Sequence, residues 1–299
     1  MSLAPVRISA LRHSAFYSPL LYTIRSGLLE AEGLKPSYAP STPDKPLAQQ
    51  LQSGAVHLSQ SAVAVSFAEL ERGVARPDIA HFAQINSRDG FFLARRGRDS
   101  GSGFDWRELE GKEVLVDHLF QPLATLKYAC RRKGVDYSTL RVVDAGQPDD
   151  MERAFREGQG DFVHMQGPAA QQLEHDGVAT LVASVGEALS PVAFSSLCAK
   201  RSWLETDEAR AFLRAYRQGR QAAAEQPAAE VAGVVRPFFP EIELDVLTAT
   251  VASYQSSGTW AGDSSIPLDT YETLLDIFLE AGIVTQRHPY EAAIASVVE

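Results

Sequence analysis

The sequence predicts an α/β protein of two lobes, joined by a double-crossover hinge and followed by a helical C-terminal segment. The chain has 299 residues, which is about two domains at the usual size of ~150 residues. Strand-like and helix-like runs alternate as far as Ala199, and the chain from Thr206 onward shows mostly helical periodicity. Polar or Pro/Gly-containing segments separate two such α/β blocks. They place the first lobe at 1–86 and 195–299, the second lobe at 91–187, and the hinge at 87–90 and 188–194.

The first block opens with a strand over 6–11, in which apolar residues alternate with polar ones. Ser18 and Pro19 suit the cap and the first position of a helix, and Gly33 ends that helix. The block continues with strands at 35–39, 56–59 and 79–85, a helix opened by 41–44, and a helix at 61–72.

The second block repeats the alternation, so we expect parallel sheets with helices on both faces. Its predicted strands are 91–95, 113–116, 140–143, 162–165 and 178–182, and its helices are 122–132, 148–157 and 168–175. A strand at 194–199 precedes the helical segment, whose helices are expected at 207–225, 228–238, 243–254, 268–281 and 290–297. Helices do not extend a sheet, so this segment should pack around the first lobe.

Composition and charge exclude several classes of protein. Apolar residues make up 45% and charged residues 22%, which are ordinary globular values. The net charge of −10 repels nucleic-acid phosphates, so no nucleic-acid partner is expected. No apolar run reaches the ~18–20 residues of a membrane helix. No signal peptide is visible, so the chain is cytoplasmic if its N-terminus is native, or a mature form without its leader.

The familiar catalytic and metal-binding motifs are missing from the sequence. It has no GxGxxG, P-loop, GxSxG or HExxH pattern, and its histidines are dispersed. Cys130 and Cys198 are expected to be free thiols, with no zinc-like spacing. We therefore expect no cofactor and no metal.

Several predicted strands end in small polar or aromatic clusters that lead directly into a helix. In open α/β sheets, ligands bind beyond the carboxyl ends of strands, where helix N-termini present free amides. Strand ends from two lobes that face each other would form a ligand cleft. These clusters are 13–18, 40–44, 60–61, 117–122 and 166–168.

Motifs that are individually weak, but occur over nearly the whole chain, resemble those of a known family. The run 16–20, followed by Gly27, Glu32 and Gly33, resembles the opening of periplasmic solute-binding proteins of ABC importers. The relevant family binds nitrate, sulfonates, taurine and thiamine-pyrimidine precursors. Further blocks match in order and spacing, at 51–61, 109–116, 161–168, 258–260 and 279–284.

The resemblance implies a fold, a function and partners. The fold is that of a two-lobed type II periplasmic binding protein. The function is that of the solute-binding component of an ABC-type importer, which captures a small organic ligand by hinge closure. A sulfonate or other organic anion and an aminopyrimidine-like molecule remain open as ligands. The partner is the membrane permease, the protein is a monomer, and its location is the periplasm or cell envelope.

The resemblance also carries ligand-binding positions onto this sequence. Tyr17 and Phe120 would sandwich an apolar or planar group from opposite lobes, and Gln60 with Ser61 would take a polar or anionic group. His118 and His164 could donate to the ligand. The full set is Phe16, Tyr17, Asp44, Gln60, Ser61, Asp117, Phe120, Gln121, His164 and Gln166.

Two other functions stay open. Desulfinase-like relatives on this scaffold place a nucleophilic cysteine in the loop after the first strand, and pyrimidine synthases carry a Cys-rich motif. Neither feature occurs here, so an enzyme is the alternative rather than the main prediction. A ligand-sensing domain of a regulator would need a helix-turn-helix, and none precedes Ala4.

Overall fold

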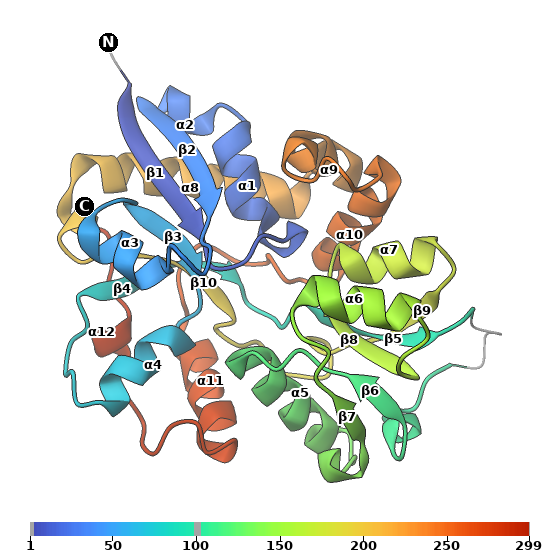
Figure 1. Cartoon of the computed structure of the whole chain (residues 1–299). Helices are drawn as coiled ribbons and strands as arrows, with labels where there is room; N and C mark the ends of the chain where they lie inside the picture. The colour runs from blue at the N-terminus through green and yellow to red at the C-terminus, as the bar shows by residue number, and fades with distance from the viewer. Residues whose placement is uncertain (1–2, 99–102, 299) are drawn as a thin grey trace.

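Two five-stranded sheets organise the chain (Figure 1). The structure, a computed structural model, describes residues 3–98 and 103–298, so 1–2, 99–102 and 299 of the predicted lobes lie outside it. The first sheet has the order β2-β1-β3-β10-β4 and the second β7-β6-β8-β5-β9. We call each sheet with its flanking helices a lobe. The first sheet comprises β1 (Ala4–Ala10), β2 (Leu34–Pro40), β3 (Leu58–Ser61), β4 (Ile79–Asn86) and β10 (Ser195–Lys200). The second comprises β5 (Phe91–Arg96), β6 (Glu113–Leu115), β7 (Arg141–Val143), β8 (Phe162–Gln166) and β9 (Ala179–Ser184).

Both sheets are mixed, so the prediction of purely parallel sheets is wrong. β10 runs antiparallel to β3 and β4, and β5 runs antiparallel to β8 and β9. For β5 the cause is the short crossover: only residues 87–90 separate β4 from β5. So short a link lets the chain enter the second sheet only at the strand ends that face the first lobe. The carboxyl ends of the other strands of the second sheet lie there, so β5 must run antiparallel to them.

The helices of the two α/β blocks lie close to the predicted positions, with differences at some of their starts. The single helix predicted between Ser18 and Gly33 is wrong: the left-handed backbone of Gly27, with φ of 84°, separates two helices there. α5 begins at Phe120 rather than Pro122, because proline is tolerated within the first turn of a helix. α4 begins at Ala64 rather than 61, since β3 extends through Ser61. The helices are α1 (Ser18–Arg25), α2 (Leu28–Ala31), α3 (Leu47–Ser53), α4 (Ala64–Glu71), α5 (Phe120–Arg132), α6 (Pro148–Arg156) and α7 (Ala169–His175).

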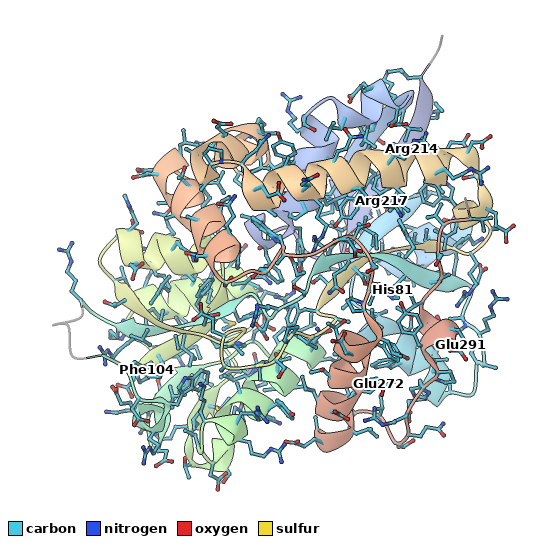
Figure 2. All side chains as sticks on the ribbon, turned by 180° about the vertical axis from the view of Figure 1, so that it is seen from behind. His81, Phe104, Arg214, Arg217, Glu272 and Glu291 are labelled. Atoms are coloured by element: carbon cyan, nitrogen blue, oxygen red, sulfur yellow. The ribbon has the colours of Figure 1, made fainter. Side chains whose placement is uncertain are left out.

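The C-terminal segment is helical, as predicted, and wraps around the first lobe. It contains α8 (Asp207–Glu225), α9 (Ala228–Val235), α10 (Leu244–Ser256), α11 (Leu268–Glu280) and α12 (Tyr290–Ala293). α8 packs on α1 and α2 and, seen from behind, runs across the first lobe with Arg214 and Arg217 on it (Figure 2). α10 also contacts α7, and α11 contacts α5, so the segment touches both lobes.

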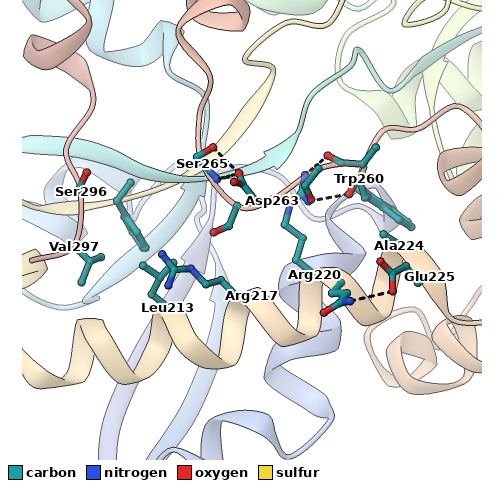
Figure 3. A pocket seen from close by; sticks show the side chains of 15 residues that line it. Leu213, Arg217, Arg220, Ala224, Glu225, Trp260, Asp263, Ser265, Ser296 and Val297 are labelled. Atoms are coloured by element: carbon teal, nitrogen blue, oxygen red, sulfur yellow. Dashed lines mark hydrogen bonds between the residues drawn. The ribbon is translucent and has the colours of Figure 1, made fainter. Parts of the chain in front are cut away.

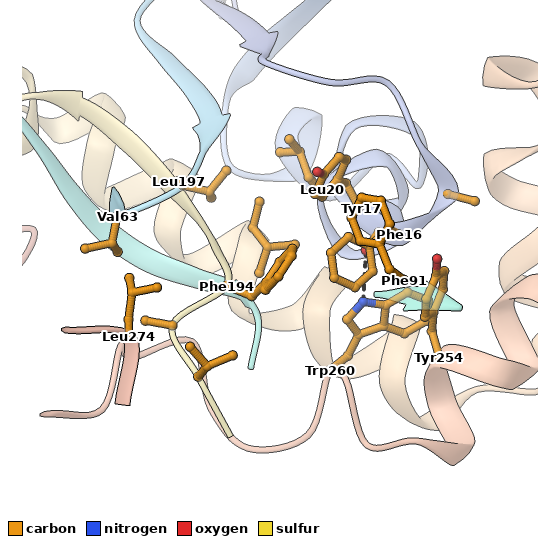
Figure 4. Packing of buried hydrophobic residues seen from close by; sticks show 14 of the residues in the cluster. Phe16, Tyr17, Leu20, Val63, Phe91, Phe194, Leu197, Tyr254, Trp260 and Leu274 are labelled. Carbon is orange, nitrogen blue, oxygen red and sulfur yellow. Dashed lines mark hydrogen bonds between the residues drawn. The ribbon is translucent and has the colours of Figure 1, made fainter. Parts of the chain in front are cut away.

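An aromatic cluster fills the core where the lobes meet (Figure 4). The rings of Phe16 and Tyr254 lie 5.0 Å apart, and those of Phe16 and Phe194 lie 5.6 Å apart. The indole nitrogen of Trp260 donates to the Phe16 carbonyl oxygen at 3.1 Å and to Asn86 Oδ1 at 2.8 Å. The cluster therefore ties the loop after β1 to the C-terminal segment and to the crossover strands.

Candidate functional site: the cleft between the lobes

A cavity of about 710 Å³ lies where the carboxyl ends of strands from both sheets meet. That volume is in the range of pockets that hold small organic ligands. The first lobe contributes the loops after β1 and β2, and the second lobe contributes the ends of β6 and β8 and the start of α6. The lining residues fall in 11–14, 40–41, 147–152, 164–169 and 238–242, with Phe91, Asp117 and Gln172 in addition.

An ion pair crosses the cleft from one lobe to the other. Both terminal nitrogens of Arg12, which follows β1, bind the two carboxylate oxygens of Asp117, which follows β6, at 2.7 and 3.1 Å. The side chains are only 20% and 7% exposed, so solvent screens this pair less than a surface pair. Burial alone would raise the pKa of Asp117, but the hydrogen bonds and charge of Arg12 outweigh it and lower that pKa. Asp117 is therefore ionised at neutral pH.

Further hydrogen bonds join the lobes beside this pair. Ser14 Oγ of the first lobe donates to the carbonyl oxygen of Gly167 in the second lobe at 2.6 Å. The Gly167 N–H donates to the hydroxyl of Tyr254 at 2.9 Å, and that hydroxyl donates to the Gly90 carbonyl oxygen at 3.0 Å. α10, the first hinge segment and the end of β8 thus meet at the base of the cleft.

His164 lies at the cleft and has no partner for either ring nitrogen. It is fully buried, and its ring stacks on Phe91 with centroids 4.5 Å apart. Burial lowers the pKa of His164 to about 3, so the ring is neutral at neutral pH. A neutral imidazole offers one donor and one acceptor. Buried polar atoms rarely stay unpaired. Both nitrogens are covered by protein, so a ligand in the cleft reaches them only if the surrounding side chains move.

Aromatic side chains form part of the first-lobe wall. His13 Nδ1 lies 3.0 Å from the hydroxyl of Tyr38, and Nε2 lies 2.8 Å from the Phe238 carbonyl oxygen. The His13 ring also stacks on Phe239, with centroids 4.7 Å apart. The wall combines flat apolar surface with fixed polar atoms, as ligand pockets commonly do.

The structure brings three of the ten predicted site residues to the cavity: Asp117, His164 and Gln166. The others do not line it. Asp44 and Phe120 are exposed elsewhere, and Phe120 is 71% exposed. The remaining five are buried: Phe16, Tyr17, Gln60, Ser61 and Gln121.

Some of these buried residues support the cleft from below. Gln60 Oε1 accepts hydrogen bonds from the backbone N–H groups of Leu11 and Arg12, which fixes the loop that carries the guanidinium. Gln121 Nε2 donates to the Phe194 carbonyl oxygen of the second crossover at 3.0 Å. Burial raises the pKa of Tyr17, and the nearby Arg12, Ser195 and Gln166 side chains only partly offset this effect. A ligand contact for these residues remains a prediction.

Sequence reasoning missed Arg12 and the segment 238–242 as cleft residues, and it left Ser14 out of the ligand-binding set although Ser14 lies in the predicted cluster at 13–18. Arg12 precedes the predicted cluster at 13–18 by one residue, so a slightly wider window at the strand end would have found it. Segment 238–242 comes from the helical third of the chain. It reaches the cleft only through the packing of α9 and α10, which no local pattern predicts.

A second and larger cavity, of about 980 Å³, lies between α8 and residues 260–265 on the back of the first lobe (Figure 3). Arg220 points from α8 to this loop and donates to the carbonyl oxygens of Trp260 at 2.8 Å and Ala261 at 3.1 Å. It also donates to the Gln84 carbonyl oxygen at 3.2 Å. Its N–H groups donate to backbone carbonyl oxygens, so Arg220 holds the loop in place. The cleft is the stronger candidate because only there do strand ends of both lobes converge.

The cysteines and the possible metal ligands lie outside the cleft. Both cysteines are free, as predicted, and burial raises the pKa of each thiol to about 12. Neither is among the described residues that line the cleft. Within 3–98 and 103–298, His175, Glu243 and Asp245 form the one group close enough to share a cation, and all three are exposed. None of these residues lines the cleft.

The paired mixed sheets and the interlobe cleft define the class: the fold is that of a type II periplasmic binding protein. The chain belongs to the NMT1/THI5-like family, whose model matches residues 15–230. It is 25% identical over 299 residues to YtlA of Bacillus subtilis (strain 168), provisionally named a binding protein. That match covers 98% of this chain and 88% of YtlA.

Solved structures show the same fold at lower identity. The ligand-binding component of an ABC-type import system from Staphylococcus aureus, solved with zinc bound, superposes with a TM-score of 0.77. Its identity is 15%, over 98% of this chain and 97% of that one. The periplasmic aliphatic sulphonate binding protein SsuA from Escherichia coli gives a TM-score of 0.76 at 14% identity, over 100% of this chain and 94% of that one. These matches confirm the predicted fold class.

Proposed function

We propose that this protein is the solute-binding component of an ABC-type importer. It captures a small organic molecule in the cleft between its lobes. The observation that carries the proposal is the cavity of about 710 Å³ bounded by both lobes, with the buried and unpartnered nitrogens of His164 in its lining. The Staphylococcus aureus and Escherichia coli neighbours, a component of an import system and a sulphonate binding protein, support it.

Capture proceeds by closure of the two lobes about segments 87–90 and 188–194. The ion pair of Arg12 with Asp117 and the hydrogen bond of Ser14 with Gly167 span the lobes, so both form on closing and break on opening. A ligand that contacts both walls stabilises the closed state by its extra contacts there.

The partners follow from this role. The closed, loaded protein delivers its ligand to a permease in the membrane, and it acts as a monomer in the periplasm or cell envelope. The similarity to SsuA, a periplasmic protein, supports this location. In the parts of the chain that the structure describes, none of the helices combines the length and the apolar character needed to cross a bilayer.

We propose a binding protein rather than an enzyme. The named neighbours are binding proteins, and the cleft has no cysteine. In the closed cleft Arg12 and Asp117 are paired with each other, so neither is free to act as an acid or base on a ligand.

The test is to purify the protein without denaturation from the cells that produce it and to analyse a denatured extract by mass spectrometry. We expect one small organic compound near one equivalent per chain. Returning it to stripped protein at about 100 times its Kd should stabilise the fold by ~2.7 kcal/mol, measured by thermal melts. Conversion of the compound into another on incubation would instead show an enzyme. A protein that retains no compound and gains no stability from the cell extract would contradict capture.

A further inference from the structure

The described lining of the cleft has one cationic side chain, and that side chain is already paired with a carboxylate. Arg12 is the only lysine or arginine among the described residues that line it. Its two terminal nitrogens bind Asp117 at 2.7 and 3.1 Å. An organic anion held in the closed cleft therefore finds no free guanidinium or ammonium on the described lining, and it would have to displace a buried carboxylate held by two hydrogen bonds.

Asp117 occupies the place that a bound anion would take. It lies just before α5, a helix of 13 residues, and its Oδ1 accepts the backbone N–H of Leu119 at 2.9 Å. A helix N-terminus and a guanidinium together form a favourable anion site. Here the protein supplies the anion from its own chain.

Further carboxylates make the rest of the lining negative. Asp149 comes from α6 in the second lobe and Glu241 from the segment before α10, so they flank the cleft from different walls. Both are exposed, and neither has an ion-pair partner among the described residues. A third, Glu152, is bonded by Arg156 at 2.8 Å. Two uncompensated carboxylates lower the local concentration of anions and raise that of cations.

His164 adds a polar requirement that is independent of charge. Its neutral ring has one acceptor nitrogen and one N–H donor, and neither has a partner among the described residues. Unpaired buried polar atoms are costly, so a ligand that offers this ring both a donor and an acceptor gains binding free energy.

We propose that Asp117 determines the charge specificity of the cleft: as a built-in anion on Arg12, it excludes organic anions and favours a protonated organic amine. This inference rests on the proposed binding function and narrows its ligand class. The ligand of this chain would then differ in charge from that of SsuA, which is named for binding an aliphatic sulphonate.

The experiment uses two probes with the same body and opposite charge, benzylamine and phenylmethanesulfonate, titrated calorimetrically into stripped protein. The variants are Asp117→Asn, Arg12→Gln and, as a control for net charge, Glu110→Gln, an exposed residue outside the cleft lining. In the wild type we expect the sulfonate to bind at least tenfold more weakly than the amine. Asp117→Asn frees the guanidinium, so its affinity for the sulfonate should rise at least tenfold. Glu110→Gln should leave both affinities within twofold.

Arg12→Gln keeps the test decisive if Asp117→Asn does not fold. It leaves Asp117 unpaired, so the amine should bind more tightly and the sulfonate not at all. The proposal is overturned if the wild type binds the sulfonate as tightly as the amine, or if neither variant changes the preference. A sulfonate or other anion recovered from the native protein would overturn this charge assignment and leave ligand capture intact.

Discussion

Asp89 is a buried carboxyl group in the first hinge segment. Its Oδ1 accepts the Phe91 N–H at 2.7 Å, and its Oδ2 accepts the Thr125 hydroxyl of α5 at 2.5 Å. Burial raises the pKa of Asp89 from 3.8 to about 7, because the charged form loses its hydration. The hinge thus contains a group that titrates near neutral pH.

Asp89→Asn should change how stability depends on pH. Between about pH 4 and 7 the folded state holds a proton that the unfolded state has released, so stability falls as pH rises through this window. The contribution is fully present below pH 3.8 and is lost as pH passes about 7. At ~1.4 kcal/mol per pKa unit, the effect is at most ~4 kcal/mol. Melts of both proteins at pH 5 and pH 8 measure it. If the difference in stability between Asp89→Asn and the wild type is the same at pH 5 and pH 8, the pKa of Asp89 is not raised.

His164 and His81 form a matched pair of buried histidines. Burial lowers the pKa of each to about 3, but His81 Nδ1 lies 2.7 Å from Ser196 Oγ whereas His164 has no partner among the described residues. His164→Phe removes unpaired polar atoms, so it should stabilise the stripped protein by ~1–2 kcal/mol and weaken ligand binding. His81→Phe should destabilise it, since Ser196 loses its partner. Melts and titrations with the extracted ligand check both variants. A loss of stability in His164→Phe would mean that this ring is a packing residue.

Individual site residues were only partly predictable. Asp117 follows β6, whereas His164 lies within β8 and Gln166 ends it, and the carboxyl end of each strand lies at the cleft. Tyr17 and Phe120 also sit near strand ends, yet one is 4% and the other 71% exposed. An aromatic residue in such a loop can turn into the core or out to solvent. The choice depends on partners that no local pattern identifies, such as Ser195 and Gln166 for the Tyr17 hydroxyl.

The crossing of α1 and α8 depends on a glycine. A Cβ added at Gly219 on α8 would overlap Thr23 on α1, whose hydroxyl donates to the Pro19 carbonyl oxygen. Gly233 on α9 is the matched control, because it is also helical and nothing lies within 4 Å of an added Cβ.

Gly219→Ala should destabilise the protein by ~1–3 kcal/mol, since the two helices must move apart. Gly233→Ala should stabilise it by ~0.5–1 kcal/mol, since alanine loses less backbone entropy than glycine in a helix. Chemical denaturation of the two variants gives both values. Similar effects from both substitutions would show that the helices do not pack this closely.

At the scale of elements, the sequence predicted which segments are helices and strands better than their directions. The alternating pattern identified every strand of both sheets except for small shifts at the ends. The predicted direction was wrong for β5 and β10, because periodicity carries no information on the end at which the chain enters a strand. For β5, the short crossover at 87–90 contained that information, since so few residues cannot carry the chain to the far end of the second sheet.

At the scale of the whole molecule, the interlobe cleft is compared with the larger cavity behind α8 as the place of the ligand. The cleft lies between the lobes, and the larger cavity lies within the first lobe behind α8. Only a ligand in the cleft contacts both lobes, so only there can binding favour closure. Capture by closure therefore requires that the ligand occupy the cleft.

A matched pair of cavity-filling variants decides this. Ser41 lines the cleft and Ser296 lines the larger cavity, so Ser41→Trp and Ser296→Trp each fill one site with the same side chain. Native mass spectrometry of both variants and the wild type, purified alike from the producing cells, measures the bound small molecule. We predict that Ser41→Trp loses the compound and that Ser296→Trp retains about one equivalent. Retention by Ser41→Trp together with loss from Ser296→Trp would contradict capture in the cleft and place the ligand behind α8.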